Sequence, residues 1–410
     1  MEARDVVRFL RRGATLPVRG PAGWLSVADA RRAARRALPR PVLEFVEGGA
    51  EDEVTVRRNE AAWDGRPVVG RVLRGVDRPD LTTRVAGVEL PMPVVLGPAG
   101  FTGTLRPRGE LAVARAAAAA GIPYAVPLAA STTDLGTLAA ANPHGLWANH
   151  YPFADRARDH DLLERAWAAG CRVLVVTVDV PVAGWRERDL RNGFTVPPRP
   201  DVTTLGHYVA RPGWLARFLR AEALGTPNVG DTGVLASSSS FPALFKRDVS
   251  WSDIAAIRAV WPGRVLVKGV LSPADAVLAA EVGVDGVVVS NHGGRQLDGL
   301  AATADVLADV AACAREHGLD VLVDSGIRRG RHVVTALALG ASAVLVARPY
   351  LYGLAAGGQE GVERVVALLR AEVERTLHLA GFACVADVAG WLEVRPGSPP
   401  EISGSRRTLR

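Results

Sequence analysis

One stretch of the sequence decides the fold, and it runs Val287-Val288-Val289-Ser290-Asn291-His292-Gly293-Gly294-Arg295-Gln296-Leu297-Asp298-Gly299. An apolar β-type run ends there in polar residues and a glycine pair, which is the pattern of a buried strand that stops at a turn. Gly293 and Gly294 permit a sharp turn and a close approach to a ligand. The stretch therefore predicts a strand that delivers a histidine and an arginine to the rim of a sheet.

These two side chains have a chemical use in common. A neutral imidazole just past a buried strand can act as a general base, and a fixed guanidinium can hold a carboxylate by two parallel hydrogen bonds. The simpler alternative is a loop in which His292 and Arg295 only cap the next helix. The rest of the chain decides between them.

Short apolar segments separated by helical patterns begin near residue 93 and continue along the chain. The expected strands are Pro93–Leu96, Tyr124–Val126, Leu146–Ala148, Val173–Thr177, Val265–Lys268, Gly286–Ser290, Val321–Asp324 and Ala343–Val346. The expected helices include Gly109–Ala120, Asp161–Gly170, Ser272–Val282, Ala301–His317 and Arg331–Leu339. Continuously apolar strands alternating with helices predict an α/β fold of the parallel (β/α)₈ (TIM) barrel type. A doubly wound open sheet is disfavoured because no G-x-G-x-x-G follows the first strand.

The barrel is expected over residues 91–385, after an N-terminal helical segment (1–90) packed on it and before a C-terminal tail (386–410). After the fourth strand the alternation is interrupted by more than 80 residues, between Val180 and Val265. A long insertion at the catalytic face is usually a lid or a partner-contacting segment. We expect a lid over about 191–250, with a Gly/Ser-rich middle at Gly225–Ser240. A loop without function is the alternative.

The composition excludes several classes of protein. The 410 residues are 48% hydrophobic and can bury a large core, yet no uncharged apolar run of about 18 residues predicts a membrane span. The charged N-terminus lacks an apolar signal core, so a cytoplasmic protein is expected. Widely spaced Cys171, Cys313 and Cys384 predict neither a disulfide framework nor a metal site. The net charge of +6 comes from dispersed basic residues, so no nucleic-acid partner is expected.

Polar residues at the strand ends are the candidates for chemistry, because barrels bind ligands there. Thr177 and Asp179 lie at the end of the fourth strand, and Arg186 follows them. Lys268 ends the fifth strand, and it is one of only two lysines among 49 basic residues. The last two strands end in Asp324-Ser325-Gly326-Ile327-Arg328 and Ala347-Arg348, where such barrels usually bind phosphate.

Together, the quoted stretch and these strand ends resemble the signature of the FMN-dependent α-hydroxy-acid oxidases and dehydrogenases, which include glycolate oxidase, lactate dehydrogenase and monooxygenase, and mandelate dehydrogenase. The resemblance covers nearly the whole chain from about Leu38 to Gly381. It implies an FMN enzyme that oxidises an (S)-2-hydroxy acid to the 2-oxo acid and passes the electrons to oxygen or another acceptor. It also implies a homotetramer.

The resemblance further implies roles for single residues. In the catalytic set, a histidine takes a proton, an aspartate orients it, two arginines bind the substrate carboxylate and a tyrosine lies near the hydroxyl: His292, Asp179, Arg186, Arg295 and Tyr151. The flavin contacts are Lys268, Thr177, Asn149, Ser290, Pro98, Ala99 and Gly100, with Asp324 on the ribityl chain and Gly326, Arg328 and Arg348 at the phosphate. A cation such as Lys268 beside the N1–C2=O edge of a flavin stabilises negative charge as the ring is reduced.

Several positions depart from the family pattern. Phe45 stands where the family usually has a tyrosine that contacts the substrate carboxylate, and Leu128 lies where a serine or threonine commonly contacts the flavin. Asn149 replaces a glutamine, keeping the amide on a chain one methylene shorter. Gly100 and Ala130 are small where some relatives carry bulkier groups. The two small residues favour a pocket that admits a large or aromatic substrate, and Phe45, Leu128 and Asn149 favour an unusual substrate such as a biosynthetic intermediate.

The expectation is therefore FMN-dependent oxidation of a 2-hydroxy carboxylic acid. One alternative is a related FMN oxidase for a larger, aromatic or biosynthetic substrate, and a second is lactate 2-monooxygenase-like activity, which the long insertion favours. A third, from another class, is a phosphate-binding barrel that has lost catalysis. The intact set of His292, Asp179 and Arg295 argues against the third.

Overall fold

The computed structural model describes residues 20–143, 145–221, 224–229, 236–237, 244–389 and 391. Most of the Gly/Ser-rich segment expected at Gly225–Ser240, and the tail from residue 392 onward, lie outside the described residues.

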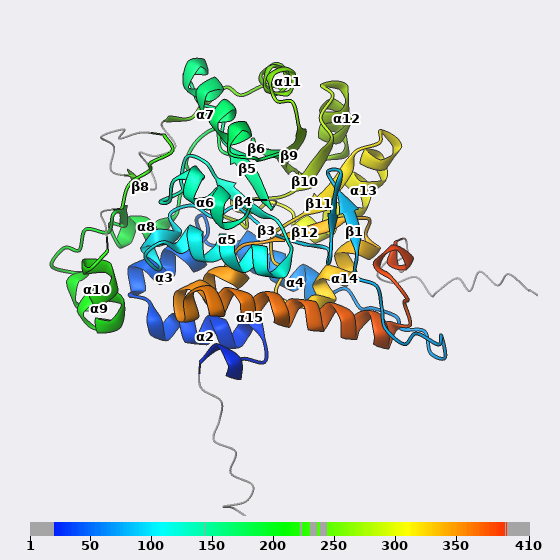
Figure 1. Ribbon diagram of the computed structural model, residues 1–410, viewed down its shortest axis with the longest axis horizontal. Helices are drawn as coiled ribbons and strands as arrows, with labels where there is room; N and C mark the ends of the chain where they lie inside the picture. The colour runs from blue at the N-terminus through cyan, green and yellow to red at the C-terminus, as the bar shows by residue number, and fades with distance from the viewer. Residues whose placement is uncertain are drawn as a thin grey trace, which may run out of the picture.

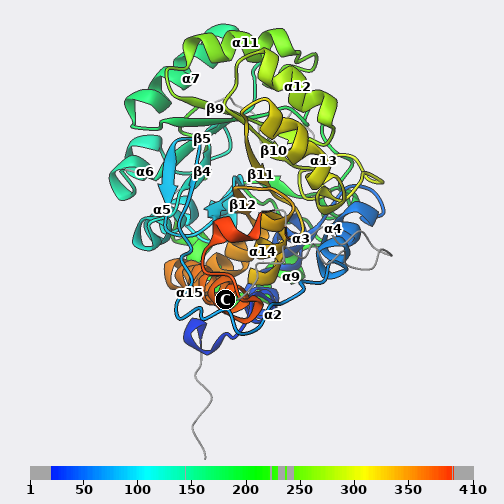
Figure 2. The same cartoon turned by 90° about the vertical axis from the view of Figure 1, so that its right-hand side faces the viewer.

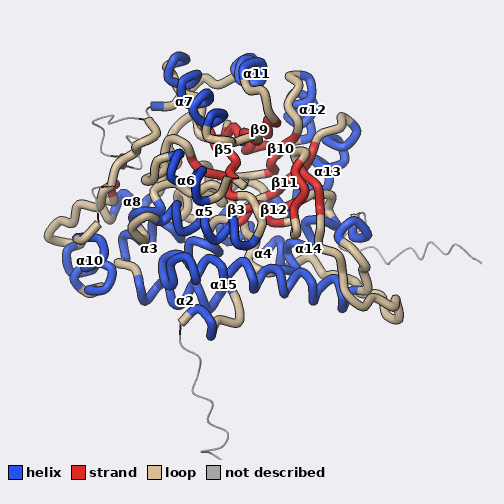
Figure 3. The backbone as a smooth tube through the Cα atoms, viewed as in Figure 1, coloured by secondary structure: helices blue, strands red, loops and turns tan. Residues whose placement is uncertain are grey.

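Eight parallel strands close into a barrel, in the order β10-β11-β12-β3-β4-β5-β6-β9 (Figures 1 and 3). They are β3 (Val94–Leu96), β4 (Tyr124–Pro127), β5 (Leu146–His150), β6 (Val173–Thr177), β9 (Arg264–Val270), β10 (Gly286–Val289), β11 (Asp320–Val323) and β12 (Ala343–Val346). Every expected strand is present, so the (β/α)₈ barrel is confirmed.

A helix follows each strand on the outside of the barrel, and Figure 2 shows α7, α11, α12 and α13 arranged around the strands. These helices are α5 (Gly109–Ala120), α6 (Leu135–Ala141), α7 (Arg156–Ala168), α11 (Trp251–Val260), α12 (Pro273–Glu281), α13 (Thr303–Glu316), α14 (Gly330–Ala338) and α15 (Arg348–Ala380). In the described part of the chain, none of the helices is both long and apolar enough to cross a membrane.

The start of α7 differs from the sequence expectation of a helix over 161–170. The helix begins five residues earlier, at Arg156, because the Asp155 carboxylate accepts hydrogen bonds from the backbone N–H groups of Ala157 and Arg158. Such a cap satisfies N–H groups that have no partner in the first turn. The expected start at Asp161 is wrong because it does not take the Asp155 cap into account.

Three helices and a hairpin precede the barrel. They are α2 (Val27–Ala37), α3 (Arg40–Glu47), α4 (Val54–Asp64) and the antiparallel pair β1 (Thr83–Val85) and β2 (Val88–Leu90), after a short 3₁₀ turn at Pro21–Gly23. In Figure 1, α2 lies along the long helix α15. The hairpin packs at the N-terminal end of the barrel, where Thr83 donates to Ser342 O and Ala86 N donates to Asp320 Oδ2. The opposite end of the barrel is left for a site.

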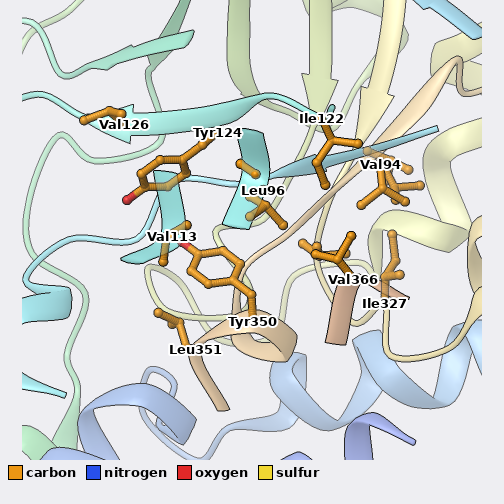
Figure 4. Packing of buried hydrophobic residues seen from close by; sticks show 14 of the residues in the cluster. Val94, Leu96, Val113, Ile122, Tyr124, Val126, Ile327, Tyr350, Leu351 and Val366 are labelled. Atoms are coloured by element: carbon orange, nitrogen blue, oxygen red, sulfur yellow. The ribbon is translucent and has the colours of Figure 1, made fainter. Parts of the chain in front are cut away.

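Alternate residues of each strand pack on opposite sides of the barrel wall. The interior is filled by a cluster that includes Val95, Trp147 and Leu266. The outward side chains pack under the helices, and Figure 4 shows Leu96 and Tyr124 with Tyr350 and Val366 of α15 in this second cluster. Both sides of the strands are therefore buried, which explains why the strands are continuously apolar.

The long insertion leaves the barrel after β6 and returns at α11. Its described elements are α8 (Glu187–Arg191), β7 (Thr195–Val196), α9 (Leu205–Val209), α10 (Pro212–Leu219) and β8 (Ala236–Ser237), with β7 and β8 paired antiparallel. The helices α9 and α10 form a lobe at the left of Figure 1. Since the insertion starts at a strand's C-terminal end, it lies at the end of the barrel opposite the hairpin.

Candidate active site

The C-terminal ends of the strands enclose a pocket whose volume, including its mouth, is about 1480 Å³. The structure brings most of the candidate residues to its wall: Tyr151, Arg186, Lys268, His292, Arg295, Asp324, Gly326, Arg328, Arg348, Pro98, Ala99 and Gly100. The other candidates, Asp179, Thr177, Asn149 and Ser290, do not line the pocket. Of these, Asp179 and Ser290 are hydrogen-bonded to lining residues, and Asn149 is bonded to Thr177.

His292 and Asp179 form a hydrogen-bonded pair, with 2.9 Å between His292 Nδ1 and Asp179 Oδ1. Burial disfavours the charged imidazolium and lowers the pKa of His292, while the Asp179 carboxylate acts in the opposite direction. For Asp179, burial favours the neutral acid, but the His292 ring holds the pKa of the carboxyl below its ordinary value. At neutral pH the pair is therefore a neutral imidazole on an ionised carboxylate.

The backbone of the turn after β10 sets the direction of the His292 side chain. His292, Gly293 and Gly294 all have positive φ, at 56°, 67° and 74°. A Cβ on Gly294 would lie 2.8 Å from the backbone nitrogen of Val56 in α4, so only glycine fits this close approach. A non-glycine residue in the left-handed region is unusual, and such backbone strain gathers at functional sites.

Lys268 is buried at the C-terminal end of β9. The pairing of β9 with β10 shifts by one residue after Lys268, and the adjacent Gly269 has φ 118°. Lys268 Nζ donates to Ser290 Oγ at 2.9 Å and forms an ion pair with Asp324 Oδ2 at 3.1 Å. Burial opposes the ammonium, but the carboxylates of Asp324 and Asp179 raise the pKa of Lys268 to about 12. The pocket therefore holds a permanent cation.

Two arginines are fixed beside the histidine by backbone carbonyls. Arg295 Nη1 donates to Phe45 O and Gly48 O, both at 2.8 Å, and Arg186 Nε donates to Arg295 O at 3.1 Å. Burial and the neighbouring Arg186 lower the pKa of Arg295 to about 10, which still leaves the guanidinium charged at neutral pH.

Gln296 connects these residues by hydrogen bonds, a role that was not expected from the sequence. Its Oε1 accepts from Arg186 Nη2 at 2.8 Å, while its Nε2 donates to Asp179 O and Val182 O. One amide thus ties Arg186 to the segment that carries Asp179. The sequence did offer one indication of this role, because Gln296 directly follows Arg295 in the stretch Val287–Gly299.

Asn149 lies fully buried in β5, behind the pocket wall. Its Nδ2 donates to Thr177 Oγ1 at 2.8 Å and to Val175 O at 3.0 Å. Its Oδ1 is buried without a hydrogen-bond partner among the described residues. A buried acceptor without a partner costs free energy, so this oxygen is an unusual feature of the region beside the pocket.

The ends of β11 and β12 carry the two arginines expected at a phosphate, and both line the pocket. Arg348 donates to the carbonyls of Val46, Gly293 and Gly48, and Arg328 Nη2 pairs with Glu60 Oε1 at 2.9 Å. The buried Arg328 Nε has no partner among the described residues. Pro98, Ala99 and Gly100 follow β3, the neighbour of β12, and also line the pocket; a Cβ on Gly100 would lie 2.5 Å from that of Ala130.

Aromatic side chains form an apolar wall of the pocket, most of which was not expected from the sequence. Phe45 stacks on Phe194 with 4.6 Å between ring centroids, and Tyr151 stacks on Phe245 with 4.9 Å. The Arg295 guanidinium lies over the Phe45 ring at 5.2 Å. Phe194 and Phe245 lie far from the strand ends in the sequence, so no local pattern linked them to the site.

Comparison with known proteins agrees with this geometry. The family model described as FMN-dependent dehydrogenase matches residues 34–392. The L-lactate dehydrogenase of Caulobacter sp. (strain K31) is 41% identical over 362 residues, which cover 87% of this chain and 94% of that protein.

Solved structures agree as well. The structure of the monotopic membrane protein (S)-mandelate dehydrogenase matches with a TM-score of 0.84 and 37% identity, covering 89% of this chain and 98% of that chain. A soluble mutant of the membrane-associated (S)-mandelate dehydrogenase from Pseudomonas putida gives a TM-score of 0.76 and 36% identity, covering 89% and 97%. The chain therefore belongs to the FMN-dependent dehydrogenase family, whose members include flavoprotein oxidoreductases acting on hydroxy acids.

Proposed function

We propose that this enzyme oxidises a 2-hydroxy carboxylate to the 2-oxo acid, with His292 as the base. The observation that carries the proposal is the 2.9 Å hydrogen bond between His292 Nδ1 and Asp179 Oδ1 at the pocket wall. Because Asp179 engages Nδ1, the proton would be accepted at Nε2. The carboxylate then stabilises the imidazolium that forms.

Arg186 and Arg295 would clamp the substrate carboxylate. Both line the pocket, and the hydrogen bonds that fix them leave other guanidinium N–H groups for a ligand. Such charge-assisted, two-point binding orients the substrate carbon as well as adding affinity. Tyr151 lines the same part of the pocket and would donate to the substrate hydroxyl oxygen.

The residues present fit FMN. At the pocket wall, the buried cation of Lys268 and the Arg328 Nε, which has no partner among the described residues, match a carbonyl edge and a phosphate. We propose that the flavin is held by Lys268, Asn149, Thr177, Ser290 and Pro98–Gly100, the ribityl chain by Asp324, and the phosphate by Gly326, Arg328 and Arg348. When bound, FMN accepts the two electrons that leave the substrate carbon.

Anaerobic mixing with 2-hydroxy acids tests the proposed reaction. We expect the flavin absorbance to bleach and one equivalent of the 2-oxo acid to form per flavin. A flavin-loaded protein that stays oxidised with every acid of a panel containing lactate, glycolate and mandelate would contradict the proposal.

A large aromatic substrate is the more specific proposal. In the apolar wall, Tyr151 is accompanied by Phe45, Phe194, Val196 and Phe245, which carry no hydroxyl for a small polar substrate, and stacked aromatic rings favour another ring. The described part of the insertion supplies three of these residues and would cover the pocket and exclude water. Bleaching by (S)-mandelate at lower concentration than by (S)-lactate supports this choice, and the reverse order contradicts it.

Assembly as a homotetramer is also a proposal. Light scattering of the purified protein should give four times the chain mass of 43.2 kDa. A monomer at micromolar concentration would contradict it.

A further inference from the structure

Asn59 of α4 and Asn291 of the loop after β10 form a reciprocal pair of hydrogen bonds. Asn59 Nδ2 donates to Asn291 Oδ1 at 2.9 Å, and Asn291 Nδ2 donates to Asn59 Oδ1 at 2.8 Å. Both residues are 1% exposed, and neither lines the pocket. We call Asn59 and Asn291 the amide pair.

The side-chain polar groups of the amide pair are all partnered within the protein. Besides the reciprocal bonds, Asn291 Nδ2 donates to Ala301 O at 3.0 Å, and Asn59 Oδ1 accepts from Thr303 N at 3.4 Å. These two further partners lie at the start of α13, which packs beside α4 (Figure 2). A buried network of this kind resists opening, because the loss of one partner leaves other polar groups unpaired. The amide pair therefore fixes backbone rather than binding a ligand.

The amide pair lies next to the residue proposed as the base. Asn291 directly precedes His292, whose φ of 56° is in the left-handed region. This conformation costs free energy in a non-glycine residue and persists only where the surrounding structure holds it. The bond from α4 to residue 291 supplies such a hold.

The same helix holds the loop on the other side of His292. Asp298 accepts hydrogen bonds from Val54 N at 3.0 Å and Thr55 N at 2.7 Å, in the first turn of α4. The N-cap residue of α4 makes no side-chain cap, so the loop supplies the cap and the helix in turn fixes residue 298. The loop is thus tied to α4 both before and after His292.

We propose that the amide pair positions His292 for proton transfer, which makes Asn59 a positioning residue outside the pocket. This inference rests on the proposed function, in which His292 is the base. The amide pair fixes the backbone beside His292, and Asp179 holds Nδ1 of its ring at 2.9 Å. Together these two contacts direct Nε2 towards the substrate. Without the amide pair the backbone relaxes and the alignment of the ring is lost.

Asn59→Ala in the flavin-loaded full-length protein tests this inference. With the 2-hydroxy acid that reduces the unaltered enzyme fastest, we expect reduction to slow roughly 10- to 100-fold, because small displacements of a reacting group are costly. The Kd of the corresponding 2-oxo acid should stay within about threefold, because Arg186 and Arg295 keep their carbonyl partners. Reduction at the unaltered rate, or a rise in Kd as large as the loss in rate, would overturn the proposal.

The double variant His292→Ala/Asn59→Ala separates positioning from general support. If Asn59 acts only through His292, the double variant should be reduced within about twofold of the rate of His292→Ala. An additional loss as large as that of Asn59→Ala alone would overturn the proposal. Normal reduction of His292→Ala would refute the base itself, whereas slow His292→Ala with normal Asn59→Ala would refute only the positioning.

Asn59→Asp offers a conservative rescue. A protonated carboxyl has the shape of the amide, and it both donates to Asn291 Oδ1 and accepts from Asn291 Nδ2, whereas the ionised form has no donor. Burial raises the pKa of a carboxyl, so reduction relative to the unaltered enzyme should be closer to normal at about pH 5.5 than at about pH 8. Rates equal to those of Asn59→Ala at both pH values would overturn the proposal.

Asn228→Ala is the matched control. Asn228 is 3% exposed, accepts from Leu135 N at 2.8 Å and donates to Thr133 O at 3.2 Å. Its partners follow β4, which lies across the barrel from β10. Both Asn→Ala variants should retain FMN and melt at a lower temperature, but Asn228→Ala should be reduced within about threefold of the normal rate. An equal loss of rate in the two variants would overturn the proposal.

Discussion

The pocket has two walls that are built in different ways. The strand-end wall carries His292, Lys268 and Arg295, and each is fixed by a carboxylate or a backbone carbonyl. The insertion wall carries Phe194 and Phe245, which are placed by ring stacking. The residues proposed for the chemistry are thus held by the barrel, whereas Phe194 and Phe245, which are proposed to select the substrate side chain, belong to the long insertion. Such a division lets one fold serve several substrates by changing its loops.

Asp179→Asn breaks the strand-end wall and should have the largest effect. Without the carboxylate, the His292 tautomer is no longer fixed and the imidazolium is not stabilised, so flavin reduction should slow by roughly 10²–10⁴-fold. Rapid mixing under anaerobic conditions measures the rate. Asp201→Asn, an exposed aspartate of the insertion, is the control and should react at the normal rate.

The pH dependence of flavin reduction tests the same pair, His292 and Asp179. Burial lowers the pKa of His292, and only the neutral ring accepts a proton, so reduction should rise through a pKa below 6.5 and level off above it. The Asp179 carboxylate raises that pKa, so the rise in Asp179→Asn should move to lower pH. A shift to higher pH would contradict the assigned pair.

Arg295→Lys keeps the positive charge at this position of the strand-end wall. It removes the planar guanidinium, which can donate two parallel hydrogen bonds to a carboxylate. Loss of one hydrogen bond to a carboxylate costs about 1.5–3 kcal/mol, so the Kd of a 2-oxo acid should rise about 10- to 150-fold. Titration of the flavin absorbance measures it. Arg191→Lys, which pairs with Glu187 on the surface, serves as the control.

Gly294→Ala tests whether close packing holds the strand-end loop. With φ 74° and a new Cβ 2.8 Å from Val56 N, the variant should lose about 1–3 kcal/mol of unfolding free energy in urea. Gly299→Ala is matched, because Gly299 has φ 81° and nothing within 4 Å of a Cβ. A smaller loss in Gly299→Ala isolates the steric part, and equal losses would refute it.

Phe45→Tyr probes the boundary between the two walls and should have the smallest effect. If small hydroxy acids are the substrates, a hydroxyl here should improve their binding by about 0.5–1.5 kcal/mol, the net contribution of one hydrogen bond. Because Phe45 stacks on Phe194, we expect (S)-mandelate binding to be unchanged or weaker. Stronger binding of lactate than of mandelate in the variant would locate the size selection at residue 45.

The difference between the strand-end wall and the insertion wall also explains which parts of the site could be predicted from the sequence. Strand-end residues such as Lys268 and Asp324 were found because a barrel brings all its strand ends together, and the structure places both at one pocket. The partners that fix them depend on tertiary contacts. The hydrogen bonds of Arg348 to Val46 and of Arg295 to Phe45 join residues about 300 and 250 positions apart, which no local pattern encodes.

The insertion was the least predictable region. A lid was expected from the length of the insertion and its place at the catalytic face, but the sequence did not indicate that α9 and α10 form a lobe with an aromatic anchor of Tyr208 and Trp214. These helices are short, and their stability comes from packing rather than from sequence propensity. The start of α7 was also missed, because it depends on the cap that Asp155 forms.

Flavin reduction in His292→Ala tests the central claim most directly. If His292 is the base, the variant should retain its FMN but be reduced by (S)-mandelate roughly 10²–10⁴-fold more slowly. His160→Ala removes a surface histidine that lies 3.5 Å from Glu164 on α7, and it should be reduced at the normal rate. Reduction of His292→Ala at the rate of the unaltered enzyme, with full flavin content, would contradict the account.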